Sequence, residues 1–305
     1  MPSPLSRREF ITQTSLTAVG LTVFSCAPSK KASAAVPGLQ LGYSAITWGG
    51  NDAQAIKDIS ALGFKGIQLR SNTLKEYGAN PQVLRDLLQQ NGLELPMFSS
   101  GNANINTRDD AAVIATHVAN AKFVKALGGS NIQLTNSSRP KTGAPSTDDL
   151  EKYGRLLNEI AKQTQAIGVQ SNYHNHMGQL GQTPEEVERI LNVTDPAYVK
   201  FLLDIAHYKQ GGGDPARAIH TYKNRLHALH LKDVRDNPAG NAGAYTFVEL
   251  GQGRIDLPAV FKALKDINFK GWGIVELDSV PSKDKTPVQC ANITKTYLSS
   301  IGVMS

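Results

Sequence analysis

The segment SNYHNHMG, Ser171 to Gly178, places two histidines two positions apart, directly after an apolar, strand-like run. Imidazole nitrogens bind divalent metal ions, and near neutral pH they also accept and donate protons. Because side chains alternate along a β-strand, His174 and His176 point to the same side of a strand that runs through them. The pair can therefore serve one site, provided that other parts of the chain supply the remaining groups.

Metal-binding side chains also follow three later apolar runs. Asp204 ends VKFLLD, His230 lies in LHALHLK, and Glu276 lies in WGIVELD. Singly, each has an ordinary structural explanation: Asp204 can cap a helix, His230 can be a hydrogen-bonded core histidine, and Glu276 can pair with a lysine. Together they are harder to explain, because charged groups at successive strand ends cost desolvation and repulsion unless something binds them. Imidazole with carboxylate suits zinc, manganese or a similar divalent ion.

The elements that must position these groups follow a regular alternation. Short apolar or β-branched runs predict strands at 41–47, 66–69, 93–99, 131–135, 168–174, 199–204, 226–232 and 272–278. Amphipathic runs between them predict helices at 52–62, 80–91, 109–127, 147–167, 183–192, 214–223, 256–267 and 286–301. Capping residues stand at several of the helix starts, namely Asp109, Thr147, Thr183, Asp214 and Asp256.

Eight βα units over about 260 residues are the pattern and length of a (β/α)8 TIM barrel, an α/β fold. No break in composition marks a second domain, so the predicted barrel spans residues 38–305. The main alternative is an open doubly wound sheet. That fold usually carries a glycine-rich phosphate turn after its first strand, and TWGGNDAQ from Thr47 lacks the spacing. Active-site residues of a barrel lie at the C-terminal strand ends, where the metal-binding groups are expected.

The first 34 residues have the features of a twin-arginine export signal. Arg7 and Arg8 precede an apolar stretch too short to cross a bilayer. Two processing routes stay open: cleavage after ASA at 32–34, or lipidation of Cys26 in the lipobox-like VFSC. We therefore expect an exported protein, either free in the periplasm or lipid-anchored on its periplasmic side. A disordered cytoplasmic tail is the alternative.

Composition excludes several classes of protein. The signal carries four basic residues and one acidic residue, so its removal lowers the formal net charge from +6 to +3. The basic balance is thus poor evidence for a nucleic-acid partner, and none is expected. Cys26 lies in the signal, which leaves Cys290 without a partner in the mature chain and excludes a disulfide framework. No segment is apolar for long enough to span a membrane. The sequence leaves a homo-oligomer open.

Four motifs resemble a known family in their order and spacing. They are LLDIAH with Asp204 and His207, HLKD from His230, ELGQGRID from Glu249, and GIVELD with Glu276. These motifs resemble the xylose isomerase-like TIM-barrel superfamily, which contains sugar isomerases and epimerases, inosose dehydratases and metal-dependent AP endonucleases. The resemblance runs from GYSAITW to YLSSIG. It is specific for the superfamily and weak for the reaction.

In the epimerases of this superfamily, one divalent metal ion, commonly manganese, is held by Glu, Asp, His and Glu. The resemblance places Asp204, His230 and Glu276 at three of these positions and His174 at the first, where those enzymes have glutamate. It implies one divalent cofactor, manganese first, with zinc, cobalt or magnesium as alternatives. The departure puts a symmetric two-carboxylate epimerisation in doubt. YHNHMG is closer to the histidine-rich form of the inosose dehydratase branch.

The resemblance also implies roles around the metal. His176 would act as general base or contact the substrate, and His207 would contact sugar hydroxyls. Lys232 and Glu249 would polarise the substrate and return a proton, and Trp48 offers an apolar face to a sugar ring. For Trp48 and Glu249, loop packing or a surface salt bridge is an equal alternative. The predicted site comprises the metal ligands His174, Asp204, His230 and Glu276, the catalytic residues Glu276, His176 and Lys232, and the substrate-binding residues His207, Trp48 and Glu249.

These features predict an enzyme that acts on a small carbohydrate. The first expectation is a metal-dependent isomerase or epimerase, which removes a proton next to the carbonyl of a keto-sugar or related polyol and forms an enediolate. The alternatives are a dehydratase or lyase, of the inosose dehydratase type or by β-elimination from a 3-keto-glycoside, and a non-catalytic sugar-binding barrel. The DNA-repair branch is disfavoured, because Gln68 and Ser99 stand where it needs further histidine ligands. Export favours a substrate without phosphate.

Overall fold

The computed structural model describes residues 34–135, 139–237, 240 and 244–304. The predicted export signal, with Cys26 and both processing routes, lies outside the described residues apart from Ala34. Residues Ser33–Ser305 form one compact unit. No helix in the described part of the chain is long and apolar enough to cross a membrane.

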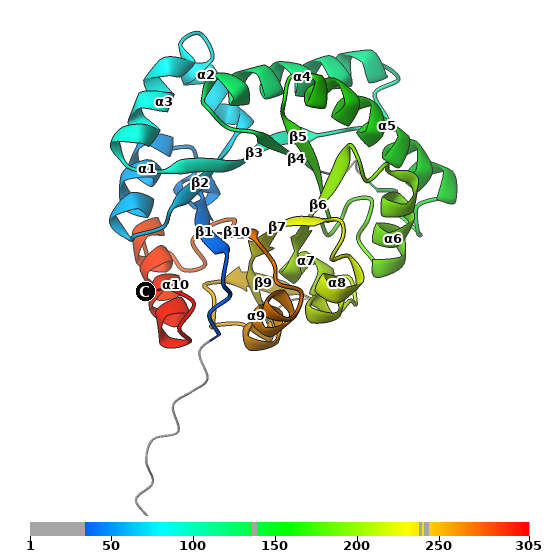
Figure 1. The fold of residues 1–305 in the computed structure, drawn as a ribbon. Helices are drawn as coiled ribbons and strands as arrows, with labels where there is room; N and C mark the ends of the chain where they lie inside the picture. The colour runs from blue at the N-terminus through cyan, green and yellow to red at the C-terminus, as the bar shows by residue number, and fades with distance from the viewer. Residues whose placement is uncertain (1–33, 136–138, 238–239, 241–243, 305) are drawn as a thin grey trace, which may run out of the picture. The chain divides into compact units, whose positions relative to one another are not determined.

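Eight parallel strands close into a barrel in the order β1-β10-β7-β6-β5-β4-β3-β2, seen as the central ring in Figure 1. The barrel strands are β1 (Leu39–Ser44), β2 (Gly66–Arg70), β3 (Glu94–Asn102), β4 (Asn131–Thr135), β5 (Gln170–His174), β6 (Val199–Asp204), β7 (Leu226–Leu231) and β10 (Gly271–Val275). This architecture confirms the predicted (β/α)8 TIM barrel. The strands lie where the sequence places them, with ends shifted by a few residues.

Helices form the outer ring in Figure 1. They are η1 (Ala45–Trp48), α1 (Asp52–Ala61), η2 (Ser71–Thr73), α2 (Leu74–Tyr77), α3 (Pro81–Gln90), α4 (Asp110–Ala126), α5 (Thr147–Ala166), α6 (Pro184–Val193), α7 (Ile205–Gln210), α8 (Pro215–Thr221), α9 (Leu257–Asp266) and α10 (Pro287–Ser300). Asp109, Thr183, Asp214 and Asp256 cap their helices as predicted. The prediction for α5 was wrong: Ser146, not Thr147, is its N-cap, because Ser146 and Asp149 form a reciprocal capping box.

Three features near the predicted site differ from the expectation. The first strand ends at Ser44, and the chain then turns through η1 to Trp48. The last strand ends at Val275, so Glu276 is the first residue beyond it. An antiparallel hairpin of β8 (Asp233–Asp236) and β9 (Tyr245–Val248) follows β7, where the sequence suggested only a loop.

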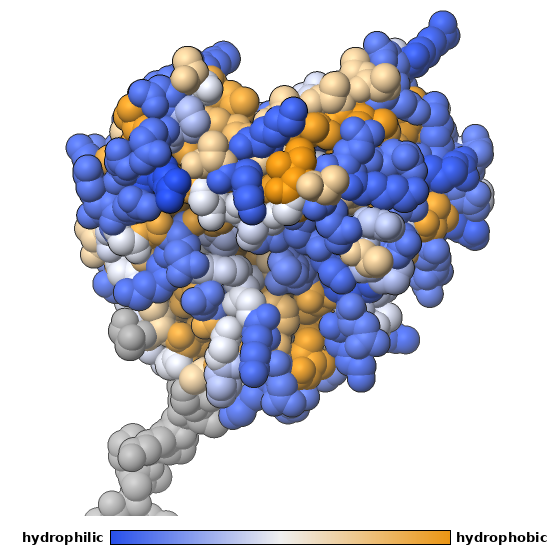
Figure 2. Space-filling model, turned by 45° about the horizontal axis from the view of Figure 1, so that its top comes forward, coloured by the Kyte–Doolittle hydropathy of each residue, from blue (hydrophilic) through white to orange (hydrophobic). Residues whose placement is uncertain are grey.

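Figure 2 shows hydrophilic residues over most of the face in view, with smaller apolar areas between them. Within the described ranges, Val83 is the one large apolar side chain that is exposed. Scattered apolar atoms of this kind are normal on a soluble surface. A homo-oligomer, which the sequence leaves open, stays a prediction.

A buried polar contact between β3 and α4 allows the pH dependence of stability to be tested. His117 on α4 has its Nδ1 2.7 Å from Ser100 Oγ, and burial lowers the pKa of His117 to about 4. The unfolded chain, with a histidine pKa of about 6.5, therefore binds a proton between pH 6.5 and 4 that the folded chain does not. The contribution of neutral His117 to the free energy of unfolding is full above pH 6.5 and is lost as the pH falls from about 6.5 to about 4.

We expect the free energy of unfolding to fall between pH 7 and pH 4 by about 3 kcal/mol more in the wild type than in His117→Gln. Urea unfolding of both proteins at a series of pH values measures the difference. Comparison with the variant cancels the other titrating groups that the two proteins share. Equal pH dependence in the two proteins would contradict the assignment.

Candidate metal centre

The predicted ligands stand one layer above an apolar cluster in the barrel interior. That cluster consists of Met97, Leu202, Ala228 and Ile274. Asp204, His230 and Glu276 each follow a member of the cluster by two positions, and strand alternation turns their side chains into the barrel. The apolar layer forms a dry floor, which strengthens electrostatic interactions above it.

The four side chains predicted as ligands converge above this floor. His174, Asp204, His230 and Glu276 are all buried, and one ligand atom of each lies within 4.8 Å of those of the others. Asp204 and His230 are partners in the register of β6 with β7. The imidazole rings of His174 and His230 have centroids 4.7 Å apart. Sequence reasoning therefore found a set of side chains that the fold brings together.

The arrangement fits a bound cation, because several buried atoms have no other partner. His174 Nδ1, Asp204 Oδ2 and His230 Nδ1 lack a hydrogen-bond partner among the described residues. An unpaired buried polar group costs about 1–3 kcal/mol. His230 Nδ1 lies 3.3 Å from Glu276 Oε1 and 3.7 Å from Asp204 Oδ2. These imidazole nitrogens and carboxylate oxygens are the donor set that a divalent metal ion binds.

The side-chain amide of Gln68 fixes the orientation of two ligands. Gln68 Nε2 donates to Glu276 Oε2 at 3.2 Å, and His230 Nε2 lies 2.9 Å from Gln68 Oε1. Since the carboxylate must receive the N–H, the amide oxygen faces His230, whose Nε2 carries the proton. His230 Nδ1 and Glu276 Oε1 are thereby left for the metal. This role of Gln68 was not predicted from the sequence, where Gln68 is only a residue in place of a histidine.

We expect Gln68→Met to weaken metal binding about 10- to 100-fold, because partners of this kind hold ligands in place. Isothermal titration of the chelator-treated protein with zinc measures the affinity. Gln133→Met is the matched control: Gln133 is also a buried barrel amide, on β4, and its Oε1 has no hydrogen-bond partner in the described part of the structure. An equal loss in both variants would show that Gln68 acts through general packing alone.

Asp204 combines two roles through its two carboxylate oxygens. Oδ1 accepts from the backbone N–H groups of Ala206 and His207, at 2.9 and 2.8 Å, and so caps α7. Oδ2 is the atom that faces the other ligands. Asn175 holds the backbone of Asp204. Its Oδ1 accepts from the N–H of Asp204, and its Nδ2 donates to the C=O of Asp204. The structural explanation of Asp204 as a helix cap is therefore correct for one oxygen and leaves the other for a metal.

The charges in the cluster favour a cation. Burial lowers the pKa of His174 well below its usual value, so this imidazole is a neutral ligand. Burial opposes ionisation of Asp204, but the nearby His207 and Lys232 outweigh it and hold the pKa of Asp204 well below its usual value. Two ligand carboxylates thus face one ammonium group, that of Lys232.

Lys232 lies between the ligand Glu276 and the partly exposed Asp278. Its Nζ lies 2.6 Å from Asp278 Oδ1 and 3.2 Å from Glu276 Oε1, and it stands 4.3 Å from the centroid of the Phe247 ring. Burial opposes its charge, but Glu276 and Asp204 outweigh burial and raise the pKa of Lys232. Lys232 is therefore a fixed ammonium donor. Asp278 and Phe247 were missed as site residues; the GIVELD motif and the alternation in YTFV were the available signals.

His176 and His207 also lie beside the ligands. Their ring centroids are 3.8 Å apart, and the His174 ring centroid lies 5.9 Å from that of His176 and 6.1 Å from that of His207. His207 Nε2 is 3.9 Å from Asp204 Oδ2. The structure thus brings both histidines to the metal ligands.

The side chains of Trp48 and Glu249 have other partners. The indole Nε1 of Trp48, in η1, donates to Asp58 Oδ2 on α1 at 2.8 Å. Glu249 accepts a hydrogen bond at 2.8 Å from Nζ of Lys285, which lies in the segment that precedes α10. Loop packing and an ion pair, the alternatives considered for these two residues, describe their observed contacts.

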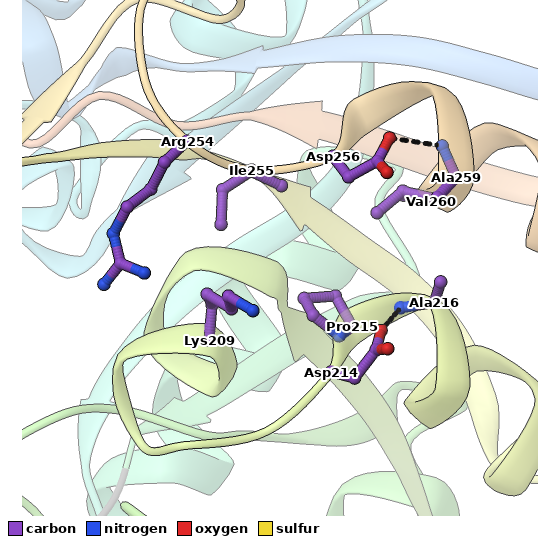
Figure 3. A pocket seen from close by; sticks show the side chains of 9 residues that line it. All are labelled: Lys209, Asp214, Pro215, Ala216, Arg254, Ile255, Asp256, Ala259 and Val260. Atoms are coloured by element: carbon purple, nitrogen blue, oxygen red, sulfur yellow. Dashed lines mark hydrogen bonds between the residues drawn. The ribbon is translucent and has the colours of Figure 1, made fainter.

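A surface pocket of about 220 Å³ lies between α7, α8 and α9, apart from the metal ligands (Figure 3). Its carboxylates are already used: Asp214 accepts from the N–H of Ala216, and Asp256 from that of Ala259, as helix caps. Arg254, at its edge, forms an ion pair with Asp236. These local contacts account for its polar groups, and the pocket is not assigned a function.

Comparison with known proteins agrees with the fold and the site. A family model described as a xylose isomerase-like TIM barrel matches residues 56–295, and the chain belongs to this family. It is 26% identical over 294 residues to an inosose dehydratase from Lacticaseibacillus casei, covering 85% of this chain and 96% of that protein.

Solved structures show the same fold. The IolI protein with a bound zinc atom has a TM-score of 0.71 at 20% identity, covering 86% of this chain and 98% of that one. A D-allulose 3-epimerase from Methylomonas sp. has a TM-score of 0.70 at 17% identity, covering 88% and 99%. The chain is therefore a xylose isomerase-like barrel with a buried metal-binding group, related to dehydratases and similar in fold to an epimerase.

Proposed function

We propose that the protein is a divalent-metal-dependent dehydratase that acts on a keto-polyol or keto-sugar. The observation that carries this proposal is the identity of the ligand set: His174 stands where a two-carboxylate epimerase needs a second glutamate. The symmetric epimerisation uses a carboxylate on each face of the substrate carbon, one to remove the proton and one to return it. Here Glu276 is one such carboxylate, and an imidazole replaces the other. The similarity to an inosose dehydratase supports the same reading.

The residues of the site have different roles in the proposed reaction. His174, Asp204, His230 and Glu276 would hold the metal ion, which when bound polarises the substrate carbonyl and makes the neighbouring C–H more acidic. We assign the removal of that proton to His176. The electron pair of the broken C–H bond forms the new double bond as the β-hydroxyl leaves. A proton added to that hydroxyl completes one molecule of water.

Lys232 and Asp278 suit the charge changes of this reaction. The ammonium group of Lys232 is buried and fixed, so it stabilises negative charge that develops on the substrate without reorganising. Burial raises the pKa of Asp278, and its side chain is 37% exposed beside Lys232. We assign delivery of the proton that the leaving hydroxyl needs to the protonated form of Asp278, which afterwards pairs with Lys232 as a carboxylate.

Proton NMR in deuterated water tests the proposal, with the zinc-loaded protein, a panel of inososes, keto-sugars and 3-keto-glycosides, and a chelator control. An unsaturated or diketone product formed with loss of water supports the dehydratase. Deuterium at carbon in an otherwise intact skeleton would replace it with the isomerase or epimerase first expected from the sequence. Release of an aglycone would indicate β-elimination from a glycoside, and no exchange with any compound would indicate a sugar-binding barrel.

We also propose that the protein works after export, in the periplasm or anchored to the periplasmic side of a membrane through Cys26. The twin-arginine pair and the ASA and VFSC segments support this location. Fractionation of cells that express the full chain, with Arg7→Lys and Arg8→Lys together as the control, tests it. Absence of the wild type from the periplasmic and membrane fractions would contradict the location, and equal amounts of wild type and variant in the periplasm would reject the twin-arginine route.

A further inference from the structure

Exposed lysines gather at the end of the barrel opposite the metal ligands. The ligands lie at the C-terminal strand ends, whereas the segments that lead into β7, β10 and β2 lie at the N-terminal strand ends. Four exposed lysines stand in these segments or in the helical turn before them, and we call them the basic rim: Lys223, Lys265, Lys270 and Lys65. Because β7, β10, β1 and β2 are consecutive around the barrel, the basic rim follows one arc of this face.

The positive charges of the basic rim are not neutralised by neighbouring acids. None of its four lysines has an ion-pair partner in the described part of the chain. Two acidic residues lie in the last helical turns of this arc, and both have other partners: Asp266 pairs with Lys262 at 2.6 Å, and Asp58 accepts from an indole N–H at 2.8 Å. Asp195 and Glu94 lie beyond the two ends of the arc, before β6 and at the start of β3. The basic rim therefore carries an excess of positive charge.

The metal end of the barrel has the opposite charge pattern. Acidic residues occupy the first turns of four helices there, and no basic residue stands among them: Asp52 in α1, Asp110 in α4, Asp148 and Asp149 in α5, and Glu185 and Glu186 in α6. The two ends of the barrel thus differ in sign. An anionic surface attracts the end with the basic rim and repels the end with the metal ligands.

The chain enters the barrel within the same arc. The N–H of Ala34 donates to the carbonyl oxygen of Ile301 at 2.9 Å. The residue after Lys270 donates its N–H to the carbonyl oxygen of Gly38 at 3.2 Å, so the start of the barrel lies directly beside the basic rim. The predicted export signal precedes Ala34 in the sequence. A membrane that holds this signal, or a lipid on Cys26, would therefore be tethered to the barrel at this end.

We propose that the basic rim docks the barrel on a membrane surface that contains anionic phospholipids, with the metal centre turned away from the bilayer. Charge complementarity and the point of chain entry select the same face of the barrel for this contact. Each lysine close to an anionic bilayer strengthens binding by about fivefold. The docked orientation leaves the metal end open to small polar substrates. This inference rests on the proposed export for the membrane concerned, and it is independent of the proposed reaction.

Vesicle sedimentation tests the surface without any anchor. It uses residues 33–305, which form one compact unit, and vesicles of phosphatidylcholine alone or mixed with phosphatidylglycerol. We expect binding to the mixed vesicles only, and loss of binding at high salt, because salt screens exposed charges. Equal binding to both kinds of vesicle, or binding to neither, would overturn the proposal.

A triple lysine variant locates the contact on the barrel. Binding to the mixed vesicles should fall about 100-fold when three lysines of the basic rim are replaced, in the variant Lys223→Gln, Lys265→Gln and Lys270→Gln. The matched control removes the same charge from three exposed lysines of the metal end and should bind like the wild type: Lys75→Gln, Lys141→Gln and Lys283→Gln. Zinc titration shows that both variants are folded. An equal loss of vesicle binding in the two variants would mean that net charge, rather than the basic rim, drives binding.

Fluorescence quenching tests the orientation of the bound barrel. Asn224 lies next to Lys223, and Thr142 is exposed at the metal end. Native Cys290 is buried, so a fluorophore reacts with a cysteine introduced at either position. A spin label on the lipid headgroup should quench the fluorophore on Asn224→Cys and not the one on Thr142→Cys. Equal quenching at both positions would overturn the orientation. Vesicle docking together with a cytoplasmic location in cells would reject the proposed export alone.

Discussion

Asp204→Asn is expected to lose metal binding and turnover together while the barrel stays folded. Asparagine has nearly the same shape, and its amide oxygen can still accept from the N–H groups of Ala206 and His207 and cap α7. Its NH2 group replaces Oδ2, the oxygen that faces His230, and offers a donor where a ligand is needed. The substitution therefore separates the two roles of this side chain.

We expect the affinity for zinc or manganese to fall by at least about 100-fold, more than for an outer partner of the site such as Gln68. Isothermal titration of chelator-treated protein measures it, and circular dichroism shows whether α7 and the barrel persist. The substrate assay follows turnover in parallel. Wild-type metal affinity in this variant would exclude Asp204 as a ligand.

Asp214→Asn is the matched control. Asp214 caps α8 in the same way, by accepting from the N–H groups of Ala216 and Arg217 at 2.9 and 3.2 Å, and it lies outside the ligand cluster. The same chemical change at the same kind of cap should leave metal affinity and turnover close to wild type. A similar loss in both variants would mean that helix capping, rather than ligation, explains the first result.

The ligand positions could be read from the sequence because they depend on two local rules. Strand alternation puts Asp204 and Glu276 on the same side as the apolar residues two positions earlier, Leu202 and Ile274. The barrel then places successive strand ends around one point, whatever the exact strand ends are. For this reason the shift of the last strand end to Val275 did not disturb the prediction of Glu276.

Residues that depend on contacts across the barrel could not be found in this way. Gln68 reaches His230 and Glu276 from a strand far away in the sequence, and no local pattern marks that contact. Trp48 was placed near the ligands because it follows the first predicted strand, and Glu249 because ELGQGRID resembles a motif of the family. Their side-chain directions depend on η1 and on the β8–β9 hairpin, which the sequence did not reveal.

A second substitution, Lys232→Met, should destabilise the metal-free protein much more than the metal-loaded one. The ammonium group of Lys232 is buried among the carboxylates of Glu276, Asp278 and Asp204, at 3.2, 2.6 and 3.9 Å. Its removal leaves buried negative charge without compensation, which costs about 3–5 kcal/mol. A bound divalent ion supplies the missing positive charge at Asp204 and Glu276. Methionine keeps an apolar contact with Phe247.

Urea unfolding with chelator and with saturating zinc measures the effect. We expect the zinc-induced gain in unfolding free energy to be larger in Lys232→Met than in the wild type. We also expect turnover of the zinc-loaded variant to fall about 100- to 1000-fold, because a preorganised donor to developing charge is lost. A gain from zinc equal to that of the wild type, with full turnover, would remove Lys232 from the site.

Lys285→Met is the matched control. It shows whether the larger zinc-induced gain in Lys232→Met arises from the loss of any lysine next to a buried carboxylate. Lys285 lies 2.8 Å from the buried Glu249, an ion pair outside the ligand cluster. Its loss should lower stability by the same amount with and without zinc, since a metal ion at Asp204 does not compensate Glu249. A metal-dependent loss at Lys232 and a metal-independent loss at Lys285 together would show that the positive charge of Lys232 and the bound cation share the same carboxylates. Lys232 would then hold the site together before the metal arrives and act on the substrate afterwards.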